Sequence, residues 1–279
     1  MALVVPPKIG RRLVEVRIGL PGGQGLRFVG EAGGRPGLDI GVKASHTSGA
    51  FPSKAKITIK NLSEQSIHAI ERTGLVVEVL AGVDFVTRLF RGDVSRVETK
   101  SDTPTRETSI EAADGQRIYR DAVLVRSWPK NTKRSQVFQD LLLAMGVSRG
   151  FVSPSIPDRV YAGGLMWAQE ARGLMDLIWD SDKGERWTLT DGAVDVMRDS
   201  ETKPGNVIVL GPDTGLIGSP ARTKKGAKIK AGFDARIRPN RGVELRAKFL
   251  KGLFRVVKAD HDLASTGLIW STAAEVVKV

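Results

Sequence analysis

The stretch Lys-Ala-Lys-Ile-Thr-Ile-Lys-Asn-Leu, residues 54–62, decides how the fold is interpreted. Its apolar and polar residues alternate, which predicts a strand with one buried face that stops at Asn61. A short helix at 63–72 is expected next, with Ser63 as its N-cap. Three further strand patterns follow at 75–82, 89–94 and 110–115. A strand, a helix and three more strands are typical of a small antiparallel β-barrel with one attached helix.

The composition is ordinary for a globular protein, with 41% apolar and 27% charged residues in 279. This length suggests about two domains. The 31 glycines and 13 prolines suit many short strands joined by tight turns. Cysteine is absent, which excludes disulfides and thiolate metal sites and fits assembly in a reducing host cytoplasm. Neither a signal peptide nor an apolar window of membrane-spanning length is found, so no membrane insertion by this chain is expected.

The pattern changes in the middle of the chain. Residues 132–146 carry an apolar stripe at helical spacing, with Ser135 as the expected N-cap and Gly146 as the terminator. A second helical stripe covers 166–180. Two helices are therefore expected where the flanking sequence predicts strands.

A hairpin and a second strand-rich part complete the chain. Asp191-Gly192 separates two alternating runs and suits a two-residue turn, because both residues tolerate positive φ. Further strands are expected at 207–210, 227–233, 243–248, 252–259 and 269–277. The predicted fold is mainly β with an α+β insertion. Two antiparallel β-barrel domains, at 1–115 and 201–279, flank a small mixed domain of two helices and a β-hairpin at 116–200.

The histidines do not form a metal-binding pattern. His46 is expected in a loop and His68 on the short helix, while Asp260-His261-Asp262 is expected near a late turn. That last triplet is the best metal candidate, but adjacent residues point in different directions and cannot easily converge on one ion. A hydrogen-bonded, structural His261 is therefore favoured over a ligand.

Catalytic motifs are also missing from the sequence. There is no Gly-x-Ser-x-Gly elbow, and the glycine clusters at 22–25 and 33–37 match neither a dinucleotide fingerprint nor a P-loop. Asp114 and Asp191 each precede a glycine, which is typical of turns. We therefore expect no catalytic, cofactor or metal site, and the sequence predicts that the protein is not an enzyme.

The formal net charge of +12 is concentrated in residues 222–258, a segment with many basic residues in which the only acidic residues are Asp234 and Glu244. Such a segment can contact nucleic acid or an acidic protein partner. A solvated strand face or an acidic neighbouring subunit is favoured over specific nucleic-acid binding. Four aromatic residues could stack on bases, although core packing is favoured for most of them: Phe233, Phe249, Phe254 and Trp270.

Three groups of motifs, taken in order, carry a family resemblance. The first is the opening stretch with Leu-Phe-Arg-Gly-Asp-Val (89–94) and Ile-Glu-Ala-Ala-Asp-Gly (110–115). The second is Thr-Gly-Leu-Ile-Gly-Ser-Pro (214–220) with Ile-Arg-Pro-Asn-Arg-Gly-Val-Glu-Leu (237–245), and the third is 252–262 with Trp-Ser-Thr at 270–272. Together they resemble the baseplate hub proteins of tailed bacteriophages. The matching structural positions are Asn61, Gly92, Asp93, Asp114, Gly115, Gly218, Pro220, Pro239, Gly242, His261 and Trp270.

The resemblance implies a structural protein of the virion, located in the tail baseplate. It implies two tube-like barrels in each protomer of a homotrimer, and thus a pseudo-sixfold ring that joins the tail tube to the central spike and leaves a lumen for genome passage. The implied partners are the tail tube or distal tail protein, the central spike protein and the tape measure protein, with DNA in transit. No lytic module is expected. The alternative function is a nucleic-acid-binding β-barrel module that uses the basic segment 222–258.

Overall fold

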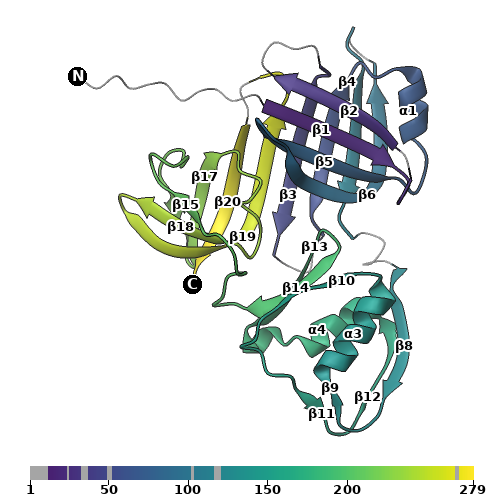
Figure 1. Ribbon diagram of the computed structural model, residues 1–279, viewed down its shortest axis with the longest axis vertical. Coiled ribbons are helices and arrows are strands. Elements are labelled where there is room, and N and C mark those ends of the chain that lie inside the picture. Colours follow the sequence, from purple (N-terminus) through teal and green to yellow (C-terminus); the bar gives the residue numbers. More distant parts are fainter. Residues whose placement is uncertain are drawn as a thin grey trace.

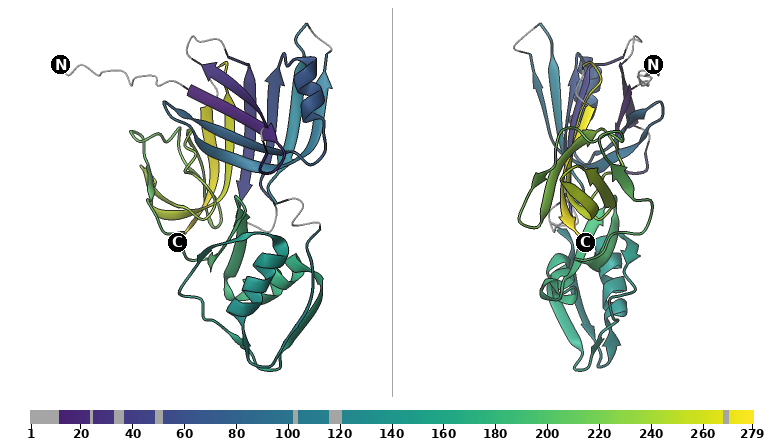
Figure 2. Two further views of the ribbon diagram at one scale, coloured as in Figure 1. Left: turned by 45° about the vertical axis from the view of Figure 1, so that its right-hand side comes forward. Right: turned by 90° about the vertical axis from the view of Figure 1, so that its left-hand side faces the viewer.

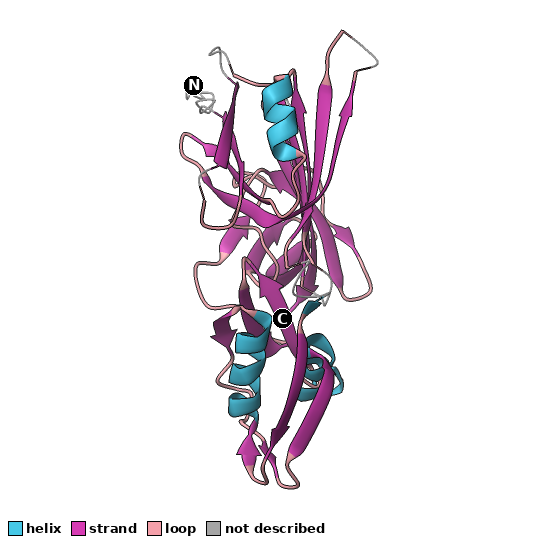
Figure 3. Cartoon of the chain, turned by 90° about the vertical axis from the view of Figure 1, so that its right-hand side faces the viewer, coloured by secondary structure: helices cyan, strands magenta, loops and turns pink. Residues whose placement is uncertain are grey.

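The computed structural model describes residues 12–23, 25–32, 37–48, 52–101, 104–115, 121–267 and 270–279. Three regions are visible: a first region of strands β1–β7, a middle region from β8 to β14, and a third region of strands β15–β20. The first and third regions lie side by side, and the middle region lies below both (Figures 1 and 2). Figure 3 shows one helix at the upper end of the molecule and the others at the lower end.

The first region confirms the predicted order of a strand, a helix and three strands. Its strands are β1 (Arg12–Gly19), β2 (Gly25–Ala32), β3 (Ile40–Thr47), β4 (Lys54–Lys60), β5 (Val76–Val83), β6 (Thr87–Lys100) and β7 (Glu107–Ala113). Helix α1 (Glu64–Ile70) follows β4, and the Ser63 hydroxyl accepts a hydrogen bond from the Ser66 N–H as the predicted N-cap. Asn61 ends β4 with a φ of 57°, which asparagine tolerates better than most residues.

Alternating burial explains which face of β4 points into the core. Ala55, Ile57 and Ile59 are buried while Lys54 and Lys56 are exposed. Since β4 pairs with β3 on one side and β7 on the other, both antiparallel, its inward face enters the core of the first region. The strand pattern of the sequence therefore sets the register of the sheet.

The third region consists of β15 (Ile208–Leu210), β16 (Ala221–Arg222), β17 (Gly226–Gly232), β18 (Gly242–Ala247), β19 (Leu250–Ala264) and β20 (Trp270–Lys278). Strand β19 is much longer than the predicted 252–259. Its first part pairs with β18, and its second part, from Lys258 to Ala264, pairs with β3 of the first region. One 13-stranded sheet therefore runs through both regions.

The mainly β fold class is confirmed, whereas the closed barrels and the domain boundaries remain predictions. The sheet runs in the order β16-β17-β20-β19-β3-β4-β7-β6-β5-β1-β2. Among the described residues no ladder joins β2 back to β3, although the Leu38 N–H donates to the Val29 carbonyl at 3.0 Å. The first region is thus strongly curled without a continuous closing ladder.

The middle region contains more strand than the sequence predicted. Its elements are β8 (Val123–Trp128), β9 (Thr132–Lys133), α3 (Arg134–Met145), β10 (Ser148–Val152), β11 (Val160–Tyr161), β12 (Leu165–Glu170), α4 (Ala171–Ile178), the 3-10 turn Ser181–Lys183, β13 (Glu185–Thr190) and β14 (Ala193–Arg198). The predicted hairpin is confirmed, since β13 and β14 pair around Asp191 and Gly192, both at positive φ. Apart from the parallel pair β10–β14, its paired strands are antiparallel.

Two helix predictions in this region need correction. Ser135 is not the N-cap of α3, because Lys133 occupies that position and Ser135 lies in the first turn, bonded through its N–H and hydroxyl to the Asp158 carboxylate. The second helix does not begin at 166, because residues 165–170 pair with β8. Strand pairing between distant segments overrides the helical spacing there. Gly146 ends α3 in the left-handed conformation, as predicted.

Each region has its own apolar core. The core of the first region also receives Leu263 and Trp270 from the third, in keeping with the shared sheet. The middle core packs the buried faces of α3 and α4 against β13 and β14, and the third core lies between β15, β17, β18, β19 and β20. Within the part of the chain that the structure describes, no helix has the length and apolarity required to cross a membrane.

Candidate functional site at the junction of the three regions

The three regions meet at the guanidinium group of Arg238. This residue lies in the loop between β17 and β18, and it donates to the Asp191 carboxylate at 2.7 Å. Its other terminal nitrogen donates to the Leu89 carbonyl at 2.7 Å and to the carbonyl of Arg88, both on β6. Arg238 therefore connects the third region to the hairpin turn of the middle region and to the first region.

The hairpin turn also binds the first region directly. The Asp191 backbone N–H donates to the Asp114 carboxylate at 3.0 Å. Burial raises the pKa of Asp114 to about 6, and the nearby charges of Asp191 and Asp93 act in the same direction. The hydrogen bond from Asp191 and the charge of Arg238 oppose this shift. Asp114 is therefore a carboxylate held in a poorly solvated position between two regions.

Two predicted motifs come together here. Asp93 on β6 is paired with Ala113 at the end of β7, so Gly92-Asp93 and Asp114-Gly115 lie side by side. They line a cavity of about 360 Å³ with Asp191 and Gly192. Position 92 requires glycine, because a Cβ there would lie 2.6 Å from the Ala113 carbonyl oxygen. This is a close-packed contact between backbones, which is the usual role of a glycine inside a strand.

A second cluster places two histidines in the interior beside the junction. His46 and His261 are both buried, with ring centroids 5.6 Å apart, and His261 Nδ1 is 2.9 Å from the Thr272 hydroxyl. Burial lowers the pKa of each histidine to about 3, and the charge of Arg238 adds to this effect. Both rings are therefore neutral at physiological pH.

These positions correct two expectations from the sequence. His46 lies on β3 rather than in a loop, and Asp260-His261-Asp262 lies within β19 rather than near a turn. The alternation of β19 buries His261 and turns both neighbouring aspartates outward, where Asp260 pairs with Lys258. Across the described ranges no group of three or more potential ligand side chains converges on a metal site.

Trp270 and Phe233 complete the wall of the histidine cluster. Their rings meet edge to face at 5.2 Å, and Phe233 also contacts His261. The Trp270 indole N–H donates to the Ala264 carbonyl at 2.7 Å. Both aromatic residues therefore pack in the interior, as the sequence favoured for most of them, and do not form a base-stacking surface.

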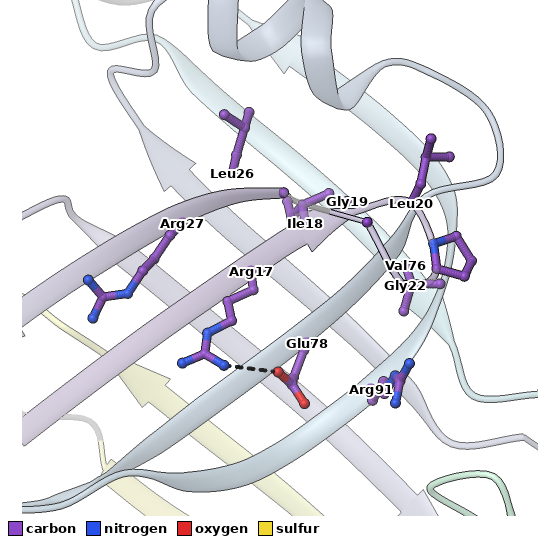
Figure 4. Close-up of a pocket in the computed structure, with 13 residues that line it drawn as sticks. Arg17, Ile18, Gly19, Leu20, Gly22, Leu26, Arg27, Val76, Glu78 and Arg91 are labelled. Carbon is purple, nitrogen blue, oxygen red and sulfur yellow. Dashed lines mark ion pairs between the residues drawn. The ribbon is translucent and has the colours of Figure 1, made fainter.

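Figure 4 shows a different pocket, of about 420 Å³, beside the β1–β2 turn. Its charged residues form a row across four strands, because Arg27, Arg17, Glu78 and Arg91 occupy facing positions on β2, β1, β5 and β6. Arg17 lies 3.5 Å from Glu78. The row continues to the buried Glu15, whose pKa is lowered chiefly by a hydrogen bond from Arg27. Most of these charges compensate one another, which indicates a structural ladder.

The other predicted motif positions serve the backbone and lie apart from the junction cavity. The Asn61 side chain accepts from the Arg106 N–H. Gly218, at a φ of 70°, and Pro220 interrupt the chain just before the edge strand β16. Pro239 lies in the turn before β18, and Gly242 opens β18 against Val207 and Leu253.

Sequence reasoning missed the central member of the junction. Arg238 was one of many basic residues in the segment 222–258, and Asp191 was identified only as a turn residue. An Asp-Gly turn signal says nothing about which group the aspartate binds, because that partner lies 47 residues away. No local pattern could have paired them.

Comparison with known proteins supports the family suggested by the motifs. The model of the family described as "Baseplate hub gp41" matches residues 60–276, which is more than half of the chain. Among curated protein sequences, none matches this chain. Solved structures also share the fold at low sequence identity, among them the following three.

The 43 kDa tail protein of prophage MuSo2 from Shewanella oneidensis has 12% identity and a TM-score of 0.64, over 95% of this chain and 98% of that one. A tail protein from Neisseria meningitidis MC58 has 11% identity and a TM-score of 0.66, over 96% of each. A type VI secretion component from E. coli, described as similar to the T4 tail proteins gp27 and gp5, has 10% identity and a TM-score of 0.58, over 87% and 74%. The chain belongs to the baseplate hub gp41 family of structural proteins of the bacteriophage tail.

Proposed function

We propose that the protein is a homotrimeric hub of the tail baseplate, which joins the tail tube to the central spike. The observation that carries the proposal is the shared 13-stranded sheet, in which β19 pairs with β18 and then with β3. Within one protomer, this shared sheet thus holds the first and third regions, the two sheet bodies of the protomer, in a fixed orientation relative to each other. Three protomers would present six such bodies, which suits a sixfold tube on one side and a threefold spike on the other.

A ring of this kind needs interfaces that repeat and close. Strands β2 and β16 end the main path of the sheet, and β15 ends its side branch, so the described part of each protomer carries three edge strands at which a neighbour can pack. Edges left open invite uncontrolled association, and burial in a closed ring removes that risk. In this arrangement the two tube-like domains, 1–115 and 201–279, surround a lumen for the genome, and 116–200 lies outside.

The partners follow from this placement. The tail tube or distal tail protein and the tape measure protein contact one face of the ring, and the spike contacts the other. DNA passes through the lumen without stable binding, and the protein acts by assembly rather than by catalysis. Incubation with purified peptidoglycan checks the last point, since release of soluble fragments would contradict it.

The trimer is tested by measuring mass in solution over a range of protein concentrations. We expect a species close to three times the 30.2 kDa of one chain. Electron microscopy of the same sample should give ring-shaped averages with threefold symmetry and six similar densities. A protein that stays monomeric, both alone and with tail partners, would contradict the proposal.

A further inference from the structure

The basic segment 222–258 divides into two classes of side chain. In the first class are basic side chains that form ion pairs with acidic residues: Lys228 with Glu275, Arg236 with Asp234, Arg238 with Asp191, Arg246 with Glu244, and Lys258 with Asp260. Arg255 is buried. The charge that the sequence suggested as a continuous basic surface is therefore largely compensated along the strands.

A group of cations without acidic partners gathers at one place. Five cations line a cavity of about 520 Å³ that lies between the turn at 222–226 and the turn at 248–251: Arg222, Lys224, Lys225, Lys251 and Lys278. Among the residues that the structure describes, no acidic side chain lines this basic cleft. Within the described residues, the four lysines form no ion pair. The cleft belongs to the third region, which is green to yellow in Figure 1.

An exposed aromatic residue lies in the same cleft. The Phe249 side chain is 73% exposed, with the Lys248 ammonium 5.2 Å from its ring centroid. Phe254 also lines the cleft, but it is buried and belongs to the core beneath. An aromatic anchor surrounded by polar or charged groups is typical of the centre of a protein–protein interface.

We propose that the basic cleft binds an acidic segment of another protein, with an apolar side chain of that segment against Phe249. Charge complementarity selects the partner, because five like charges without a local counter-charge favour a carboxylate-rich ligand. Duplex DNA fits less well. Its binding usually engages a track of many phosphates, whereas five of the basic side chains elsewhere in the segment are already paired with carboxylates. The proposal does not depend on the trimeric ring.

The test measures fluorescence anisotropy of a labelled peptide, Glu-Glu-Leu-Glu-Phe-Glu-Glu, with the full chain. Reversing two charges in Lys224→Glu/Lys225→Glu should weaken binding about tenfold or more. The matched control is Lys54→Glu/Lys56→Glu, which changes net charge equally at exposed positions on β4 and should weaken binding less than about twofold. Phe249→Ser tests the aromatic contact and should weaken binding by about threefold or more. All five substituted positions are exposed, and Tm values confirm folding.

Probes of different chemistry separate the outcomes. The same peptide with Gln in place of every Glu should not bind, and a labelled single-stranded DNA and its duplex should bind more weakly than the acidic peptide. Three results would overturn the proposal: an acidic peptide that does not bind, equal loss in the cleft and control variants, or DNA that binds more tightly than the peptide through the same lysines. The readout is independent of oligomeric state, so a failed trimer test leaves it intact.

Discussion

The junction and the basic cleft draw on the same segment of sequence, 222–258, and use its charge in opposite ways. At the junction, Arg238 lies mostly out of solvent and is bonded to Asp191 and to two carbonyl groups of β6. At the cleft, Lys224, Lys225 and Lys251 face solvent without ion pairs among the described residues. A buried, compensated cation stabilises the arrangement of the regions, whereas exposed, uncompensated cations remain available to a partner.

The largest effect expected from this comparison is on the pH dependence of stability. His46 and His261 have folded pKa values of about 3, below the ordinary value of 6.5. The unfolded chain therefore binds more protons between those limits, and stability is lost as the pH falls below about 6.5. Each histidine should cost roughly 2 kcal/mol between pH 7 and pH 5. Urea unfolding at both pH values measures the sum.

Single substitutions sharpen this prediction. His46→Gln should remove about half of the loss between pH 7 and pH 5, because one of the two buried rings can no longer gain a proton. His68→Gln is the matched control, since it makes the same substitution at an exposed position on α1. Equal behaviour of the two variants would be inconsistent with a buried, neutral histidine pair.

The next prediction compares the loss of one cation at the junction with the loss of one cation at the cleft. Arg238→Ala removes the closer of the two cations paired with Asp191, leaving only Arg88 at 3.7 Å, and it also removes the link between the three regions. It should therefore lower the free energy of unfolding by about 2 kcal/mol. Lys224→Ala removes the same charge from the cleft and should change it little. Chemical denaturation of both variants at pH 7 measures the difference. A small effect of Arg238→Ala would show that the regions are held by the shared sheet alone.

Asp114 provides a smaller effect of opposite sign to that of the histidines. Its folded pKa of about 6 lies above the ordinary 3.8. The folded state therefore binds the extra proton, and this group's contribution to stability falls as the pH rises from about 4 to 6. Asp114→Asn should remove that trend. The difference between the free energies of unfolding at pH 7 and pH 4 should therefore be about 2 kcal/mol more favourable to pH 7 in the variant than in the wild type. Asn can still accept the Asp191 N–H. Thermal unfolding across this range tests it, with Asp213→Asn on an exposed turn as control.

The smallest effect is expected at the cleft. Replacing Lys225 and Lys251 with Gln should raise Tm slightly at low ionic strength, because nearby like charges repel. The increase should disappear in high salt, where such interactions are screened. Differential scanning fluorimetry at two salt concentrations checks this. A decrease in Tm would mean that these lysines have stabilising contacts within the chain.

Much of the fold could be predicted from local pattern, and the exceptions share one cause. The β4–α1–β5–β6–β7 order, the Ser63 cap and the Asp191-Gly192 hairpin follow from alternation, capping and turn chemistry over a few residues. The helix expected from 166 was wrong in its first part because β12 pairs with β8, about 40 residues earlier. In so short a segment, the apolar pattern of a helix cannot be distinguished from that of a partly exposed strand.

The candidate site could be predicted only in pieces. Gly92-Asp93 and Asp114-Gly115 were identified as motif positions, and the structure brings them to one cavity. The hydrogen bond expected for His261 is confirmed by its contact with Thr272, but its burial beside His46 was not foreseen. The sequence contains no signal for this proximity, because it arises from the pairing of β19 with β3.

By itself, the sequence determined the mainly β class, the principal turns, the lack of recognisable catalytic motifs and the family, because each rests on short-range chemistry or on motif order. Only the tertiary structure decided that one long strand joins the first and third regions, that Arg238 links all three, and which basic residues stay uncompensated. The physical reason is that a charge or a strand edge acquires its role from whatever lies beside it. In this protein those neighbours are often far away along the chain.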